Sequence, residues 1–134
     1  MPFTHRLRVR YNECDPQDIV FNANFLTYAD IAVTELLREA FGSYTQMVAD
    51  HSVDQVVAEA RIRYRAPARF DDLVDVTLTM TDLGTTSTTT RFEMARGDTL
   101  LVDGELRHVF VDPVGWGKTP IPDAVRAALA AYGP

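Results

Sequence analysis

The feature that most constrains this chain is a polar loop that runs directly into a long amphipathic segment. From Phe25 onward, apolar residues recur at the three- and four-residue spacing that gathers them on one face of a helix. This stripe consists of Phe25, Tyr28, Ala29, Ala32, Leu36, Leu37 and Ala40. We expect the helix to begin near Asn22 or Asn24, which are both good N-cap residues, and to stop at Gly42. The rest of the chain must cover this stripe.

Runs in which apolar and polar residues alternate lie on both sides of this helix. They cover residues 5–11, 55–65, 73–81, 85–95 and 100–111. Such alternation indicates antiparallel strands with one face on a core and the other in water. Strict alternation places Val57 on the same strand face as Glu59. Residues 43–54 form a connection of undefined shape, and a short alanine-rich helix is predicted over about 123–132.

The order of these segments, strand, long helix, four strands and short helix, predicts an α+β fold. A curved antiparallel sheet of about five strands, wrapped around one long central helix, buries the helical stripe on every side. A chain of 134 residues is long enough for one sizeable core and too short for two, so residues 1–134 are expected to form one domain.

The overall charge and composition argue against several classes of function. A formal net charge of −6 argues against nucleic acid as the main partner, since phosphate binding needs a basic surface. No stretch is long and apolar enough to span a membrane, and no secretion leader is expected. The single cysteine, Cys14, rules out an internal disulfide and fits a cytoplasmic protein. Neither a glycine-rich phosphate loop nor a metal-ligand spacing predicts a cofactor or a metal.

Asp15 is the residue that gives the polar loop its chemistry. It lies just ahead of the predicted helix N-terminus, where backbone N–H groups and the helix dipole favour negative charge. A carboxylate that attacks, or that activates water, beside such an anion-stabilising helix end is a minimal acyl-transfer site.

The loop and the start of the helix also carry a family resemblance. The run CDPQDIVFNANF, residues 14–25, resembles the 4-hydroxybenzoyl-CoA thioesterase-like family of hotdog-fold acyl-CoA thioesterases. The resemblance implies that Asp15 is catalytic, as nucleophile or as general base. It also implies that the backbone N–H of Asn22 polarises the thioester carbonyl. One departure is Asp18, where the family usually has glycine.

The same resemblance implies further contacts and an assembly. It assigns Phe25 and Gln55 to substrate binding, although Gln55 can equally be read as a surface glutamine at a strand edge. Family members share acyl sites between subunits, so we expect a homodimer or a tetramer built from two dimers. An unpaired sheet edge favours the same assembly, because edge-to-edge pairing removes it.

Two alternatives stay open for the function. The acyl group could be carried by acyl carrier protein instead of coenzyme A, or the scaffold could bind an acyl or small ligand without hydrolysing it. The hairpin at 83–90 has no basic residue where family members often contact the CoA phosphates. Lys118, the only lysine, is a candidate substitute. The basic stripe of one strand is interpreted as a solvated or subunit-contact face paired with acidic residues, and a contact with the CoA phosphates is the alternative. It consists of Arg61, Arg63 and Arg65.

Other groups compete with Asp15 as the reacting residue. Asp30 and Glu35 fall on or beside the exposed side of the helix, where a solvated carboxylate is the default interpretation. Cysteine chemistry would require Cys14 to lie beside a histidine, and the order of the histidines does not support this. The three histidines are His5, His51 and His108.

Overall fold

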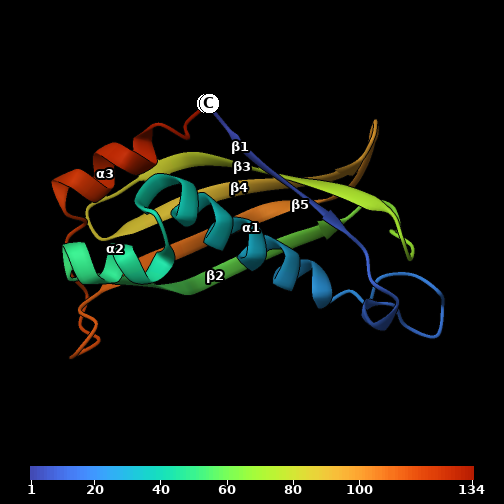
Figure 1. Ribbon diagram of the computed structural model, residues 1–134, viewed down its shortest axis with the longest axis horizontal. Helices are drawn as coiled ribbons and strands as arrows, with labels where there is room; N and C mark the ends of the chain where they lie inside the picture. Colours follow the sequence, from blue (N-terminus) through green and yellow to red (C-terminus); the bar gives the residue numbers. More distant parts are fainter.

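The chain forms one antiparallel sheet with its longest helix on the concave side, as the computed structural model of residues 1–134 shows (Figure 1). The strands are β1 (Phe3–Arg8), β2 (Asp54–Tyr64), β3 (Leu73–Leu83), β4 (Ser87–Arg96) and β5 (Thr99–Val111). Their order across the sheet is β1-β3-β4-β5-β2, and every neighbouring pair is antiparallel. The predicted α+β architecture with five strands is therefore confirmed.

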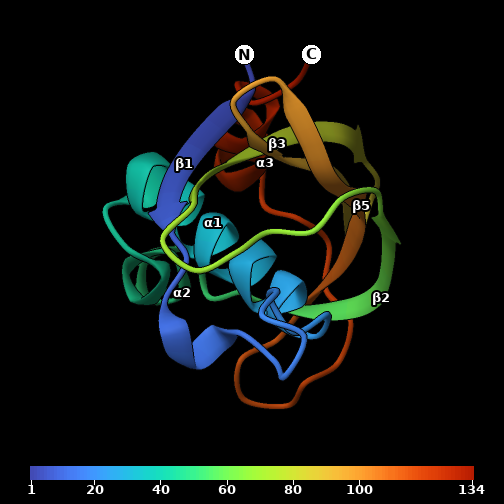
Figure 2. The same ribbon diagram turned by 90° about the vertical axis from the view of Figure 1, so that its right-hand side faces the viewer.

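Helix α1 (Asn24–Phe41) is the predicted central helix, and the sheet curves around it (Figure 2). The stripe on its inner face is buried from Phe25 to Leu37, whereas Ala40 is half-buried. Tyr28, Ala29 and Ala32 expose at most 1% of their surface. Burial of such apolar area contributes about 25 cal/mol per Å², which holds the helix against the sheet. Gly42 ends the helix with a φ of +91°, a conformation that glycine adopts without steric cost.

The start of α1 differs from the prediction in how it is capped. The N-cap position is Ala23, and no side chain caps the first turn. The side-chain amide of Asn24 instead donates a 2.8 Å hydrogen bond to the carbonyl oxygen of Glu13. The asparagine therefore fastens the preceding loop to the helix.

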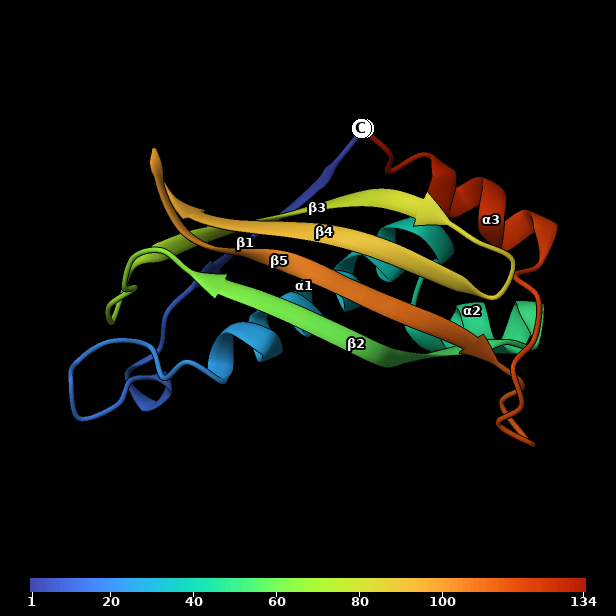
Figure 3. The same ribbon diagram turned by 180° about the vertical axis from the view of Figure 1, so that it is seen from behind.

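Two short helices and a 3-10 turn complete the chain. The undefined connection contains α2 (Tyr44–His51), which begins where the Ser43 hydroxyl oxygen accepts a hydrogen bond from the Gln46 N–H at 2.9 Å. Helix α3 (Asp123–Ala130) packs at one end of the sheet, against β3 (Figure 3). Strand β1 stops before the predicted end at residue 11, because the chain there enters the 3-10 turn η1 (Tyr11–Glu13).

A β-bulge corrects the predicted faces of β2. Val57 lies opposite His108 and Glu59 lies opposite Arg107, so the register shifts between them. Because His108 is buried, Val57 faces inward toward α1, whereas Glu59 faces outward with Arg107. One extra residue reverses the faces of all later residues in the strand, and strict alternation cannot reveal it.

Strand β2 is one edge of the sheet, and β1 is the other. On β2, Val57 and Tyr64 are 44% and 53% exposed, so large apolar residues stay partly uncovered along this edge. An unpaired edge of this kind is a site at which another strand can add. None of the helices is long and apolar enough to cross a membrane.

Candidate active site

The Asp15 loop is closed by its own backbone. The Asp15 N–H donates to the Ile19 carbonyl at 2.9 Å, and the Asp18 N–H donates to the Asp15 carbonyl at 2.9 Å. The Gln17 N–H donates to Asp15 Oδ1 at 2.8 Å, so this turn holds one carboxylate oxygen. The other carboxylate oxygen, Oδ2, receives no hydrogen bond from the chain and is available to a substrate or a water molecule.

Asp18 has a backbone conformation that explains the family's preference for glycine at this position. Its φ is +63°, in the left-handed region. Aspartate is one of the few residues other than glycine that visits this region with some frequency. The loop therefore keeps a turn that requires a positive φ, while the side chain of Asp18 is exposed.

Glu13 joins the loop to α1, a role that the sequence did not reveal. Its Oε1 atom accepts a 2.8 Å hydrogen bond from the Tyr28 hydroxyl and a 2.7 Å hydrogen bond from the Arg10 N–H. Burial and then the Glu13 carboxylate raise the pKa of Tyr28, so this tyrosine stays protonated and donates. The carbonyl oxygen of Glu13 accepts from the Phe21 N–H at 2.9 Å, in addition to the bond from Asn24.

Asn22 lies at the turn that leads into α1. Its N–H has no hydrogen-bond acceptor in the chain, and its carbonyl oxygen accepts from the Tyr64 hydroxyl at 3.0 Å and from the Phe25 N–H at 3.3 Å. The Asn22 backbone is therefore fixed while its donor stays free. A free N–H beside a helix N-terminus suits an oxygen that gains negative charge.

One pocket of about 450 Å³ brings three of the predicted residues together. Asp15, Asn22 and Phe25 line it, with Tyr64 and Arg65 from the end of β2. The rings of Phe25 and Tyr64 meet edge to face with centroids 5.9 Å apart, which forms an apolar wall beside the carboxylate. Tyr64 was missed in the sequence because only the fold brings it next to Asn22.

Gln55, the fourth predicted site residue, does not line this pocket. It lies at the opposite end of β2, in a second cavity of about 290 Å³ with Asp30, Tyr44 and His108. Within one chain, the structure therefore separates Gln55 from Asp15.

The competing groups lie in other surroundings. Burial raises the pKa of Asp30, which lines the Gln55 cavity, and Glu35 is paired with Arg38 at 3.1 Å. Burial also raises the pKa of the Cys14 thiol, and the charge of Asp15 adds to the effect. A protonated thiol is a poor nucleophile, which favours the carboxylate as the reacting group.

The basic stripe of β2 is engaged in ion pairs. Arg63 donates to Asp103 at 2.7 Å and to Glu105 at 2.9 Å, while Arg65 approaches Asp103 at 3.4 Å. The interpretation of this stripe as a solvated face paired with acidic residues fits these contacts. Arg65 is the one member that also lines the Asp15 pocket.

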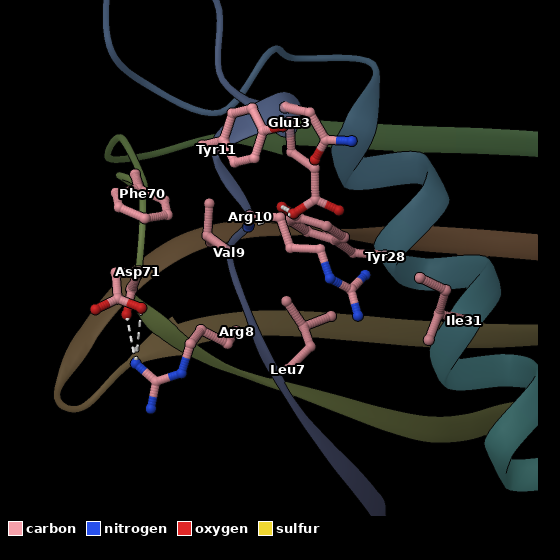
Figure 4. Close-up of a pocket in the computed structure, with 11 residues that line it drawn as sticks. Leu7, Arg8, Val9, Arg10, Tyr11, Glu13, Tyr28, Ile31, Phe70 and Asp71 are labelled. Atoms are coloured by element: carbon pink, nitrogen blue, oxygen red, sulfur yellow. Dashed lines mark hydrogen bonds and ion pairs between the residues drawn. The ribbon is translucent and has the colours of Figure 1, made fainter.

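A larger cavity of about 630 Å³ lies at the end of β1, where η1 and α1 meet (Figure 4). Arg8 within it is bound to Asp71, at 2.9 Å to the carbonyl oxygen and 3.2 Å to the carboxylate. The Glu13 carboxylate, which also lines this cavity, accepts a hydrogen bond from the Tyr28 hydroxyl. The two carboxylates that line this larger cavity are thus already engaged, Glu13 with the Tyr28 hydroxyl and Asp71 with Arg8.

The fold and the pocket together define a class of protein: a curved sheet around a central helix, with a pocket lined by the Asp15 carboxylate near the start of that helix. Comparison with known proteins identifies the family. The model of the thioesterase-like superfamily matches residues 9–129, so the chain belongs to that superfamily. The predicted family, the hotdog fold and the enzyme class of thioester hydrolase are confirmed.

Individual relatives agree with this assignment. The chain is 30% identical to the acyl-CoA thioester hydrolase YbgC of Escherichia coli (strain CFT073) over 126 residues, which cover 93% of each protein. Its structure is similar to that of the hypothetical protein TT1821 from Thermus thermophilus, with a TM-score of 0.88, 28% identity and coverage of 100% and 99%. The 1,4-dihydroxy-2-naphthoyl-CoA thioesterase Slr0204 from Synechocystis shares the fold, with a TM-score of 0.86, 22% identity and coverage of 97% and 96%.

Proposed function

We propose that this protein hydrolyses acyl-CoA thioesters in the 450 Å³ pocket, with Asp15 as the reacting carboxylate. The observation that supports this best is that Asp15 and Asn22, whose N–H has no acceptor in the chain, line one pocket at the start of α1. A thioester carbonyl placed between them would meet a base or nucleophile on one side and a hydrogen-bond donor on the other.

Two routes use the same atoms. In the first, Asp15 takes a proton from water, the water oxygen bonds to the thioester carbon, and the electron pair moves to the carbonyl oxygen. The Asn22 N–H and the α1 N-terminus stabilise that oxyanion. The carbonyl then re-forms, the C–S bond breaks, and the thiolate leaves and takes up a proton.

In the second route, a carboxylate oxygen of Asp15 bonds directly to the thioester carbon. The thiolate is expelled, and water hydrolyses the resulting acyl-aspartyl anhydride. A single turnover in water enriched in heavy oxygen tests for the second route. If Asp15 is the nucleophile and water attacks the anhydride at the aspartyl carbonyl, the label appears in the Asp15 carboxylate. If Asp15 is a general base, the label appears only in the acyl product.

The substrate contacts in this proposal come from the pocket walls. Phe25, only 3% exposed, and Tyr64 form the apolar wall for the acyl group or the adjoining arm of the thioester. Tyr64 also holds the Asn22 backbone through its hydroxyl. Both residues therefore position the carbonyl, and neither takes part in proton transfer.

We also propose that two chains pair through β2 as a homodimer, with a tetramer of two dimers as the alternative. Antiparallel pairing of this edge with its own copy places the start of one β2 beside the end of the other. Gln55 of the second copy would then approach the pocket that holds Asp15 and Tyr64. This arrangement supports a substrate-binding role for Gln55, and a monomer in sedimentation at working concentration would contradict it. The cytoplasmic location stays a prediction.

The test is release of free thiol from a panel of acyl-CoAs, compared with the same acyl groups on pantetheine and on acyl carrier protein. The proposal expects turnover with at least one acyl-CoA and a lower kcat/KM for the matching pantetheine thioester. Preference for the carrier protein would identify the alternative substrate. Binding of acyl-CoA without any thiol release would identify the non-catalytic acyl-binding module.

A further inference from the structure

The segment after β5 forms a tight projecting arm. Residues 111–118, here called the β5 arm, are bridged at their two ends as antiparallel partners. The Asp112 carboxylate accepts hydrogen bonds from the N–H groups of Val114 at 2.8 Å and Gly115 at 3.2 Å. These bonds lower the pKa of Asp112, so its carboxylate stays charged and keeps the turn together. The arm therefore has a defined shape.

The tip of the β5 arm is apolar and uncovered. Val114 is 89% exposed, more than any other large apolar residue of the chain, and Trp116 is 59% exposed. Trp116 also has a φ of +62°, a left-handed conformation that is unfavourable for a bulky residue. Aromatic side chains held in this way are typical of contact surfaces, where burial of the ring compensates for its exposure in the free chain.

The β5 arm projects past the edge strand. Val111, at its base, lies opposite Asp54, the first residue of β2. Figures 1 and 3 show the arm extending beyond β2, the strand that forms a free edge of the sheet. It therefore reaches toward a chain that adds to the β2 edge.

A second copy of the chain brings an apolar surface to that place. With the two β2 strands paired antiparallel about their middle, Tyr64 of the second copy lies beside Asp54. Val111 is then about 10 Å from that Tyr64, which is two strand spacings. The three residues from the base of the arm to its tip also span about 10 Å. The mouth of the Asp15 pocket, where Tyr64 is 53% exposed, is thus within reach.

We infer that the β5 arm of one subunit covers the Asp15 pocket of a second copy, with Trp116 packed against its Tyr64. The role of the pocket in hydrolysis rests on the function proposed above. Each chain has one arm and one pocket, so the contact forms twice and closes a symmetric dimer. The arm also brings Lys118, which is exposed, to a pocket mouth where Arg65 is already paired with Asp103. Lys118 there faces the phosphate end of a coenzyme A thioester.

Trp116 is the only tryptophan, so its fluorescence tests the contact without any measurement of activity. In a sample that sedimentation shows to be dimeric, we expect a blue-shifted emission and weak quenching by acrylamide. Trp116→Ala should raise the dimer dissociation constant by about tenfold or more, as truncation of an interface tryptophan does. The matched control is Phe70→Ala, which removes a ring of the same 59% exposure and should leave dimerisation unchanged.

Emission and quenching of a solvent-exposed indole in the dimer would overturn the inference, and so would a purely monomeric protein. Both outcomes can be read even if no acyl-CoA is hydrolysed, which separates this inference from the proposed function.

Mixed dimers test whether the arm acts on the other subunit. Chains with Asp15→Asn lack the reacting carboxylate, and chains with Trp116→Ala lack the ring of the arm. In a mixed dimer with one chain of each variant, the Trp116→Ala chain carries the intact Asp15. The intact arm of the Asp15→Asn chain covers the pocket that holds it. We expect the mixture to exceed the summed activities of the two variants. Activity equal to that sum would show that the arm does not serve the neighbouring pocket.

The proposed position of Lys118 is tested by comparing the KM values of two substrates. Lys118→Ala should raise KM for an acyl-CoA severalfold and leave KM for the acyl-pantetheine thioester unchanged, because only the former carries phosphates. An equal change for both substrates would contradict its proposed position.

Discussion

The Tyr64 hydroxyl, at the last residue of β2, donates a 3.0 Å hydrogen bond to the carbonyl oxygen of Asn22, just ahead of α1. This bond joins the edge strand to the turn that presents the free Asn22 N–H. The proposed oxyanion donor is therefore held by a residue from a different part of the chain, and its geometry depends on the packing of β2 against the start of the helix.

Removal of this bond should lower activity more than stability. Tyr64→Phe keeps the ring against Phe25 but frees the Asn22 backbone, so we expect kcat to fall about tenfold. The free energy of unfolding should fall by only about 1 kcal/mol, the net contribution of one hydrogen bond. Steady-state kinetics and urea unfolding measure the two effects. Tyr132→Phe, which loses a 2.8 Å bond to Glu39 elsewhere, is the control and should keep its kcat.

Glu13 should be required for both stability and activity, because it holds the loop to α1. Glu13→Ala leaves the Tyr28 hydroxyl and the Arg10 N–H without their acceptor, which should cost about 2 kcal/mol of unfolding free energy. Glu13→Gln retains an accepting oxygen and should recover much of this loss. Equal destabilisation by Ala and Gln would show that the charge, and not the hydrogen bonds, matters.

Asp18 provides a test of backbone strain. At a φ of +63°, glycine is the least strained residue, so Asp18→Gly should raise the free energy of unfolding by up to about 1 kcal/mol. Asp18→Ala removes the charge without providing that freedom and should destabilise the protein. Thermal or urea unfolding of the three proteins measures this. If Gly and Ala stabilise equally, the charge of Asp18 is the unfavourable feature instead.

Stability should decrease in mild acid because of His108. Burial lowers the pKa of His108 to about 4, below its ordinary value of about 6.5, so between these values the unfolded chain binds a proton that the folded chain excludes. Stability is therefore lost as the pH falls from about 6.5 to 4, by up to about 3 kcal/mol.

The difference between wild type and His108→Gln isolates this contribution. The raised pKa of Asp30, in the same cavity, acts in the opposite direction and is present in both proteins. Urea unfolding from pH 4 to 7 should show a steeper pH dependence for the wild type. Identical profiles would mean that folding leaves the pKa of this imidazole unchanged.

The sequence predicts the elements that depend on local pattern. The stripe of α1 and the alternating strands have periods that packing against a core enforces, and the structure confirms them. The sequence does not define the short helix α2, because eight residues carry too little periodicity, although Ser43 is a good N-cap residue. The bulge after Val57 was invisible because one inserted residue leaves the composition of the strand unchanged.

The residues of the candidate site also divide into those that the local sequence predicts and those that only the fold brings together. Asp15, Asn22 and Phe25 are close in sequence and were predicted together, and the structure places all three in one pocket. Contacts between distant segments could not be predicted, because they depend on the register of strands and the path of loops. The Tyr64 bond to Asn22 is one such contact. The position of Gln55, in the cavity at the far end of β2 from Asp15, also follows from the fold and not from the local sequence.

The most direct test of the central claim is the kcat/KM of Asp15→Asn for an acyl-CoA that the wild type hydrolyses. The amide nearly matches the carboxylate in shape but can neither attack the thioester nor accept a proton. The variant should keep its circular dichroism and thermal midpoint while kcat/KM falls by about 100-fold or more. Asp30→Asn and Glu35→Gln, as matched controls, should retain most of their activity. A folded Asp15→Asn protein with turnover close to that of the wild type would contradict the assignment of Asp15 as the reacting carboxylate.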